Sequence, residues 1–230
     1  SKAVSRVDSS LLDHCIRDDL KARAKVVMAV LDPLKVIIDN YPEGQMEFME
    51  LENNPENESM GTRQVPFSKE LFIEREDFME VPVKKFFRLA PLKEVRLKGA
   101  YFVTCVGVDK DADGNTTAVH CTYDPETKSG SGFDGRKVKG TIHWVSAEYG
   151  KQVTVRLYEN IVNEELGVYN EDGSLNLNPN SLTVLDNCVV EPELMNAKAY
   201  DSFQFVRNGF FCADCKDSKE GQPVFNRIVS

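Results

Sequence analysis

Alternation of apolar and polar residues is the main pattern of the chain beyond its first sixty residues. Apolar side chains recur two or four positions apart in four runs, at 95–105, 119–123, 153–157 and 203–205. A repeat of two buries one face of a strand and exposes the other, so each run predicts a β-strand. The β-branched run at 36–38 predicts one more strand.

The first 25 residues follow a different period and predict a helix. Leu12, Ile16 and Leu20 recur every four positions, which places them on one helical face. Ser9 or Ser10 can cap the start of this helix.

Turn-forming residues separate the predicted strands. Asp113-Gly114 and Asn208-Gly209 favour the positive φ angles of tight hairpins. Residues 39–44 predict a turn, 52–59 a loop or module boundary, and 159–181 a long loop. Many short strands behind one helix predict a mainly β protein built from sandwiches or barrels.

Size and composition exclude several classes of protein. With 230 residues, 41% of them apolar, the chain can form one large or two small domains and is not a disordered protein. No apolar run approaches the roughly 20 residues of a membrane helix. The chain begins Ser1-Lys2-Ala3 without a secretory signal, so we expect a soluble cytoplasmic fragment whose six cysteines are free thiols.

Three stretches resemble known sites, and we interpret each as structural. Asp109–Gly114 begins like a calcium loop but has His120 where that loop needs a bidentate glutamate, so we expect a hairpin turn. Cys212 and Cys215 have the spacing of half a zinc site without a second pair. His143 lies in an alternating run and predicts a satisfied strand histidine. We therefore expect no catalytic residue and no metal site in this chain.

The distribution of charge indicates one candidate binding segment. The net charge of −9 argues on average against RNA binding. Residues 84–98 have the opposite sign of net charge, with six cations and one anion. We expect Arg88, Arg96 and Lys98 on or near the polar side of strands, with Phe86 and Phe87 beside Arg88. Aromatic rings next to guanidinium groups suit unstacked RNA bases, whereas a solvated strand face is the alternative interpretation.

Several stretches resemble bacterial glutaminyl-tRNA synthetases. The similarity extends from about residue 9 to 229, in the order found in that family. Its most distinctive stretches are Cys15–Leu20, Met28–Lys35, Met60–Ser68, Asp134–Ala147 and Pro223–Arg227.

The resemblance is to the C-terminal anticodon-binding region of these enzymes, and it implies a fold. It implies two β-barrels of the ribosomal-protein-like type behind a helical connector at 1–25. The proximal barrel would comprise 26–50 and 144–230, and the distal barrel, 51–143, would be inserted. Together they would bind the anticodon loop of the glutamine tRNA, as a monomer. Glutamine activation, with ATP and magnesium, would belong to a catalytic domain that this chain lacks, so the fragment alone is expected to be inactive and to need no cofactor.

The resemblance also implies roles for individual residues. Arg88 matches the arginine that contacts the third anticodon base, while Arg96 and Lys98 match cations near the first base. Gln204 matches a contact to the middle base, and Arg207 matches a cation beside that pocket. Two neighbours of Arg88, Lys85 and Phe86, complete the expected anticodon site.

The chain departs from the family at the middle-base pocket. Val26 stands where the family often has an arginine, and Lys25 or Arg23 is our expected source of the missing charge. Further departures are Phe87 for a lysine, Lys98 for an arginine and Val206 for an acid. Two alternatives stay open, the corresponding part of an archaeal or eukaryotic-type glutamyl-tRNA synthetase and a β-barrel interaction module without an RNA role.

Overall fold

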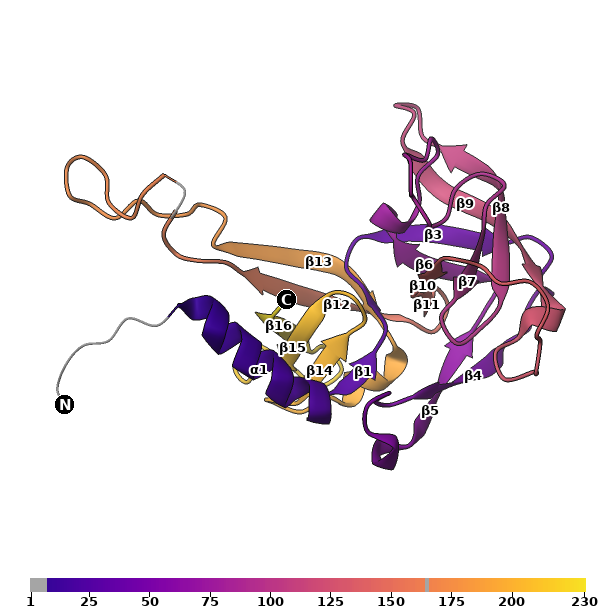
Figure 1. Ribbon diagram of the computed structural model, residues 1–230, viewed down its shortest axis with the longest axis horizontal. Coiled ribbons are helices and arrows are strands. Elements are labelled where there is room, and N and C mark those ends of the chain that lie inside the picture. The colour runs from indigo at the N-terminus through magenta and orange to yellow at the C-terminus, as the bar shows by residue number, and fades with distance from the viewer. Residues whose placement is uncertain (1–7, 164–165) are drawn as a thin grey trace.

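The computed structural model describes residues 8–163 and 166–230 of the chain. One α-helix, α1 (Ser9–Arg23), precedes two seven-stranded sheets that are each nearly closed into a barrel (Figure 1). The prediction of a mainly β protein with two barrels behind a short helical segment is therefore confirmed.

The first sheet combines the start of the chain with its C-terminal third. Its strands, in spatial order, are β1 (Lys25–Val27), β14 (Ser202–Phe205), β15 (Gly209–Ala213), β16 (Val224–Val229), β12 (Lys151–Tyr158), β13 (Leu182–Val190) and β2 (Ala29–Val30). The two edge strands, β1 and β2, are separated in sequence only by Met28. The chain itself therefore brings the two edges of this sheet together.

The second sheet is formed by the middle of the chain. Its strands, in spatial order, are β10 (Thr141–Ile142), β7 (Glu94–Leu97), β8 (Phe102–Lys110), β9 (Thr116–Asp124), β3 (Pro33–Ile38), β6 (Glu70–Glu74) and β11 (Val145–Ser146). Its edge strands are again consecutive, with only His143 and Trp144 between them. A separate ribbon of β4 (Glu47–Glu52) and β5 (Thr62–Phe67) contributes Met49 and Phe67 to the core of this barrel.

The sheets divide the chain at places other than the expected barrel bounds. Residues 33–38 form β3, which pairs with β6 and β9 of the second sheet, although 26–50 were assigned to the proximal barrel. Burial gives the reason, because Leu34, Val36 and Ile38 alternate into the second core. The first sheet takes only residues 25–30 from this part of the chain.

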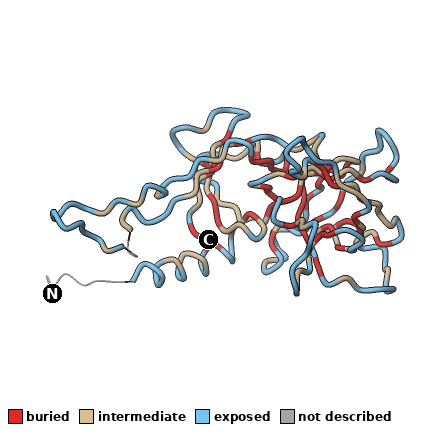
Figure 2. Tube along the Cα trace, turned by 90° about the horizontal axis from the view of Figure 1, so that it is seen from above, coloured by how far each residue is buried: buried red, intermediate tan, exposed pale blue. Residues whose placement is uncertain are grey.

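Aromatic residues fill both cores. In the second barrel, Trp144 and Phe67 meet edge to face with ring centroids 5.0 Å apart. In the first barrel, Phe205 and Phe211 stack at 4.2 Å. Val206 of the first barrel packs against the second core, so part of the contact between the barrels is apolar. Figure 2 shows the buried residues gathered in the two barrel bodies.

The helix α1 covers one side of the first barrel. Leu20 packs with Phe210 and Val229, and Ile16 is partly buried beside them, as the period of four predicts. Leu12 is exposed. Asp8 caps the helix, because its carboxylate accepts a hydrogen bond from the backbone N of Ser10 at 2.8 Å, so the expected serine cap was wrong.

The structure has turns or loops at the positions where the sequence predicted them. Asp113-Gly114 joins β8 to β9, and Asn208-Gly209 joins β14 to β15. The polar stretch at 52–59 is the connection between β4 and β5 and not a module boundary. Between β12 and β13, residues 159–163 and 166–181 extend, with the adjoining ends of these two strands, away from the barrel bodies (Figure 1). In the described part of the chain, no helix is long and apolar enough to cross a bilayer.

Candidate nucleic-acid interface

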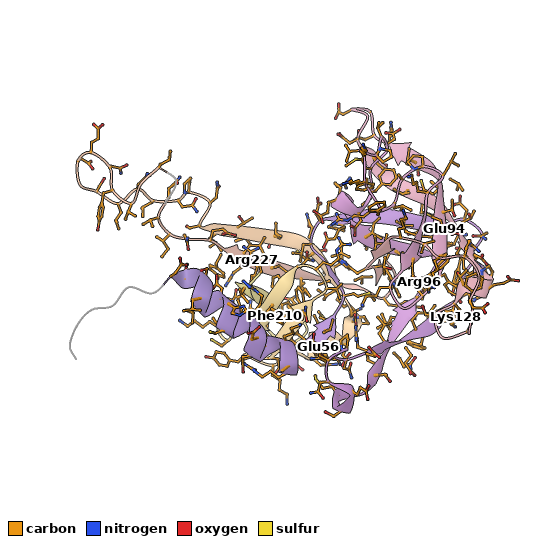
Figure 3. The ribbon with its side chains drawn as sticks, viewed as in Figure 1. Glu56, Glu94, Arg96, Lys128, Phe210 and Arg227 are labelled. Carbon is orange, nitrogen blue, oxygen red and sulfur yellow. The ribbon has the colours of Figure 1, made fainter. Side chains whose placement is uncertain are left out.

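Strand β7 presents polar side chains on its outer face. Val95 and Leu97 are buried, while Glu94 and Arg96 alternate with them and Lys98 continues the same face one residue beyond the strand. Figure 3 shows Glu94 and Arg96 on the second barrel. The prediction that Arg96 and Lys98 lie on the polar side of a strand is confirmed.

Arg96 lies in a cavity of about 290 Å³ with aromatic and cationic walls. Its guanidinium carbon is 4.3 Å from the ring centroid of Phe102, and its Nη1 donates to the hydroxyl of Ser129 at 2.9 Å. Burial lowers the pKa of Arg96. Arg136 also lies over the ring of Phe102, at 5.4 Å, and forms a two-point ion pair with Glu94. Such a cation-lined aromatic pocket can hold a flat base.

Lys98 lies in a second cavity, of about 260 Å³, between the two barrels. Its walls come from β1, the β4–β5 ribbon and the turn after β7; they comprise Val26, Glu50, Leu51, Glu52, Pro55, Arg63, Lys98 and Gly99. Val26 pairs in parallel register with Gln204, so the two side chains project from the same face of the first sheet. Gln204 thus lies beside Val26, which lines the Lys98 cavity.

The cations expected to replace the missing arginine at Val26 are paired elsewhere. Lys25 forms an ion pair with Glu193, and Arg23 pairs with Asp19 one helical turn away. The cations that line the cavity beside Val26 are Lys98 and Arg63. The expectation for Lys25 or Arg23 is therefore corrected, because Lys25 alternates to the other face of β1 and pairs with Glu193, and Arg23 pairs with Asp19 on α1.

Arg88 lies in a loop and not on a strand, which corrects the strand interpretation of residues 84–88. Exposed side chains at Val83, Lys85 and Phe87 leave this segment without a buried face that would hold it in a sheet. The loop instead rests on the backbone of Gly140, where a Cβ would lie 1.8 Å from the carbonyl O of Phe87. Lys85 has a positive φ of 69°.

A buried carboxylate brings Arg88 and Arg207 together. Asp77 Oδ1 accepts a hydrogen bond from Arg207 Nη2 at 2.6 Å and lies 3.2 Å from Arg88 Nε. Glu76 binds the same two guanidinium groups, at 3.1 Å from Arg88 Nη1 and 3.4 Å from Arg207 Nη2. Arg88 belongs to the second barrel and Arg207 to the turn between β14 and β15 of the first. This cluster therefore lies where the barrels meet.

The predicted residues thus form two groups at the junction of the barrels, with Arg96 beside one of them. Gln204 lies beside Val26, which lines the Lys98 cavity, and Asp77 joins Arg88 to Arg207. Arg96 shares its strand face with Lys98 but points into its own cavity. Phe86 is half-buried in the Arg88 loop, and Lys85 is exposed there.

Sequence reasoning missed four residues of these clusters. Phe102, Phe133 and Arg136 line the Arg96 cavity, and Asp77 holds Arg88 and Arg207. Arg136 lies within the family-like stretch 134–147, which was the one available signal for it. Asp77 follows Arg75 and Glu76 in a short polar run, where its burial leaves no trace in the sequence pattern.

The three stretches interpreted as structural have structural contacts. Asp111 accepts hydrogen bonds from the backbone N of Asp113 and Asn115 within the hairpin turn. Cys212 and Cys215 are free, as are the other four cysteines. His143 lies between β10 and β11 rather than within a strand, and its Nε2 donates to the carbonyl O of Ala29 at 3.0 Å. Across 8–163 and 166–230, no three His, Cys, Asp or Glu side chains are grouped to hold a metal.

Comparison with known proteins gives a family and close relatives. Two family models, both described as tRNA synthetases class I (E and Q), anti-codon binding domain, match residues 24–124 and 141–214. The chain is 53% identical over 230 residues to the glutamine–tRNA ligase of Clostridioides difficile and 51% identical over 227 residues to that of Pseudomonas putida. These matches cover 100% and 97% of this chain but 42% and 40% of the two relatives. The chain therefore spans about two fifths of the length of the relatives that it matches.

Proposed function

The chain belongs to the anticodon-binding domain family of class I (E and Q) tRNA synthetases, and from this premise we propose that it binds the anticodon loop of a glutamine tRNA. The observation that carries the proposal is the cluster of Arg88 and Arg207 around Asp77, at the junction of the two barrels. There, guanidinium groups from both barrels can contact one RNA loop at the same time.

The chemistry of Arg88 suits a guanine at the third anticodon position. A guanidinium can donate two hydrogen bonds to the O6 and N7 atoms of guanine. The protein contacts of Arg88 use Nε and Nη1, so within the described residues its Nη2 is left for a base. The Glu76 side chain is 70% exposed, so its ion pair with Nη1 is weak and can yield to RNA.

The remaining residues suit the other two bases. The amide of Gln204 has a donor and an acceptor, which match the edge of a uracil at the middle position. Lys98 lines the neighbouring cavity and Arg96 lies two residues before it, so both can bind near the first base. Lys85 and Phe86, in the loop of Arg88, add a phosphate contact and an aromatic surface.

The proposal extends to the whole protein of which this chain is a part. Since its relatives are glutamine–tRNA ligases more than twice as long, we propose that the remainder performs glutamine transfer with ATP and magnesium. This chain then serves tRNA recognition, as a monomer in the cytoplasm. Purified chain is expected to form no glutaminyl-tRNA alone.

Binding to short RNA hairpins tests the proposal. Wild-type chain should bind an anticodon stem-loop with guanine at the third position more tightly than one with cytosine there. Arg88→Ala should cost about 1–3 kcal/mol on the guanine RNA and remove most of that preference. Arg75→Ala is the matched control, because Arg75 lies in the same helical turn as Asp77 but contacts Asp32 and Thr116.

Each outcome has a clear meaning. Equal losses of Arg88→Ala on both RNAs would show that Arg88 contacts only the RNA backbone. A wild-type preference for cytosine would favour a glutamate-type anticodon. Absent or salt-independent RNA binding by the wild-type chain would overturn the proposal in favour of a barrel without an RNA role.

A further inference from the structure

Asp77 is a buried carboxylate whose side-chain partners are arginines from two different barrels. Its exposed fraction is 0%, and Oδ1 accepts a hydrogen bond from Arg207 Nη2 at 2.6 Å and lies 3.2 Å from Arg88 Nε. Its other oxygen, Oδ2, is buried without a partner among the described residues. The position of this carboxylate is therefore coupled to both arginines.

Backbone hydrogen bonds fix Arg88 beside Asp77 on the second barrel. The backbone N of Leu89 donates to the carbonyl O of Asp77 at 2.9 Å, and the backbone N of Met79 donates to the carbonyl O of Leu89 at 3.1 Å. These bonds close the base of the loop that carries Arg88. The backbone of Arg88 is consequently fixed next to Asp77, which keeps its guanidinium within reach of the Asp77 carboxylate.

The turn that carries Arg207 is fixed from the other side. Arg207 adopts a positive φ of 65°, and the amide of Asn208 donates to Glu74 Oε1 at 2.9 Å. The carboxylate of Glu74 also accepts hydrogen bonds from the backbone N of Leu31 at 2.9 Å and of Asp32 at 3.0 Å. The hydrogen bond to Glu74 thus holds the β14–β15 turn of the first barrel against the end of β6, three residues before Asp77.

The charge of Asp77 is what allows the two cations to lie together. Two guanidinium groups repel each other at short range, and an anion between them removes the repulsion. Burial raises the pKa of Asp77, and the hydrogen bond from Arg207, together with its charge, opposes this rise. Glu76 cannot replace Asp77 in this role, because its side chain is largely in solvent and its charge is screened.

We propose that Asp77 is a positioning residue that makes recognition of the third base by Arg88 depend on the placement of the first barrel. This inference rests on the proposed function. Arg207 follows Gln204 by only three residues at the end of β14. A shift of β14 when Gln204 binds the middle base would therefore move Arg207 relative to Asp77 and change the position of the Arg88 guanidinium.

Asp77→Asn tests the inference, because asparagine keeps the shape and one acceptor but removes the charge. The measurement is the ratio of dissociation constants for stem-loops with cytosine and guanine at the third position. Asp77→Asn should lower this ratio about tenfold in an otherwise wild-type chain. In an Arg88→Gln background it should change the ratio little, since both substitutions act on one interaction.

Glu76→Gln is the matched control, as it removes the same charge from the same two arginines at an exposed position. It should alter binding to both RNAs by a similar factor and leave the ratio unchanged. Circular dichroism and thermal unfolding check that each variant is folded. If Asp77→Asn does not fold, Arg207→Gln replaces it and should lower the ratio in the same direction, since Arg207 is the link to the first barrel.

The outcomes separate this inference from the proposed function. A wild-type chain without third-base discrimination would remove the proposed function itself. Wild-type discrimination that survives both Asp77→Asn and Arg207→Gln would leave the proposed function intact and overturn the positioning role. An equal fall of the ratio in Glu76→Gln would also overturn it, because an exposed anion beside the two arginines would then have the same effect as the buried Asp77.

Discussion

Arg63 and Glu191 form a two-point ion pair across the two barrels, with Nε–Oε2 and Nη2–Oε1 distances of 2.7 Å. Both side chains are buried, and Glu191 also accepts a hydrogen bond from the backbone N of Met28 at 2.6 Å. Arg63 lies in β5, and Glu191 directly follows β13 of the first sheet. The pair therefore fixes the β4–β5 ribbon, which forms part of the Lys98 cavity, to the first barrel.

Removing one partner of this pair should be strongly destabilising. Arg63→Met leaves the Glu191 charge buried without its cation, which costs about 3–5 kcal/mol. Urea unfolding of the chain, followed by tryptophan fluorescence and circular dichroism, measures the loss. Glu191→Leu added to Arg63→Met should recover part of it. Lys21→Met is the control, because the Lys21–Glu56 pair is exposed and should contribute little.

Gly140 should be required for the loop that carries Arg88. A Cβ at this position would lie 1.8 Å from the carbonyl O of Phe87, which is a backbone atom that cannot rotate away. Gly140→Ala must therefore displace the loop or the edge strand β10, at a cost of about 1–3 kcal/mol. We expect a lower melting temperature and weaker third-base discrimination.

Gly107→Ala is the matched control for this change. A Cβ on Gly107 would lie 3.7 Å from the Cβ of His120, which is an ordinary contact. It should leave RNA discrimination unaltered. Unchanged discrimination in Gly140→Ala would separate the Arg88 loop from recognition of the third base.

Local sequence patterns predicted most strands but not how they are shared between the sheets. The alternation of Val95 and Leu97 identified β7, because one strand face is buried whatever the neighbouring strand is. The parallel pairing of β3 with β9, in which Val36 lies opposite Val119, joins segments more than eighty residues apart. No local period encodes such a pairing, so the expected barrel bounds differ from the observed sheets.

The candidate site shows the same limit. Residue types and family-like stretches identified Arg88, Arg96 and Gln204 as RNA contacts, and this assignment stays a prediction. The grouping of Arg88 with Arg207 depends on Asp77, whose importance comes from being buried between these two arginines, which lie 119 positions apart in the sequence. Burial of a single acid within a polar run has no sequence signature, and only the structure reveals it.

His120 should make stability depend on pH. It lies between two carboxylates, with Nδ1 at 2.8 Å from Asp39 and Nε2 at 3.0 Å from Asp109, and these bonds raise its pKa. A raised histidine pKa gives stability that is fully present below the unfolded value near 6.5 and is lost as the pH rises through the native value. The melting temperature of His120→Gln should therefore lie furthest below wild type near pH 5.5, and the difference should shrink at higher pH.

The exposed His14 on α1 provides the comparison for this prediction. His14→Gln removes a histidine that pairs with Asp18 on the surface, at 3.4 Å. Its melting temperature should follow that of wild type across the same pH range. A difference between wild type and His120→Gln that does not vary with pH would show that His120 acts through packing rather than charge.

Lys98 should contribute a local and salt-dependent share of RNA affinity. Its side chain lines the cavity between the barrels, where a phosphate or base edge of the bound loop would lie close to its ammonium group. Lys98→Met should weaken binding to the anticodon stem-loop and reduce the slope of log K against log salt by about 0.7–1, as for the loss of one phosphate contact. Titrations at four salt concentrations measure both quantities.

Lys93→Met decides whether this contribution is local. Lys93 belongs to the same cationic segment, is exposed, and lines neither the Lys98 nor the Arg96 cavity. If the cavity binds RNA, Lys93→Met should change the salt slope much less than Lys98→Met does. Equal slopes for the two variants would mean that residues 84–98 attract RNA as a diffuse positive surface. The geometry of the Lys98 cavity would then contribute nothing to recognition, because a diffuse charge cannot distinguish one base from another.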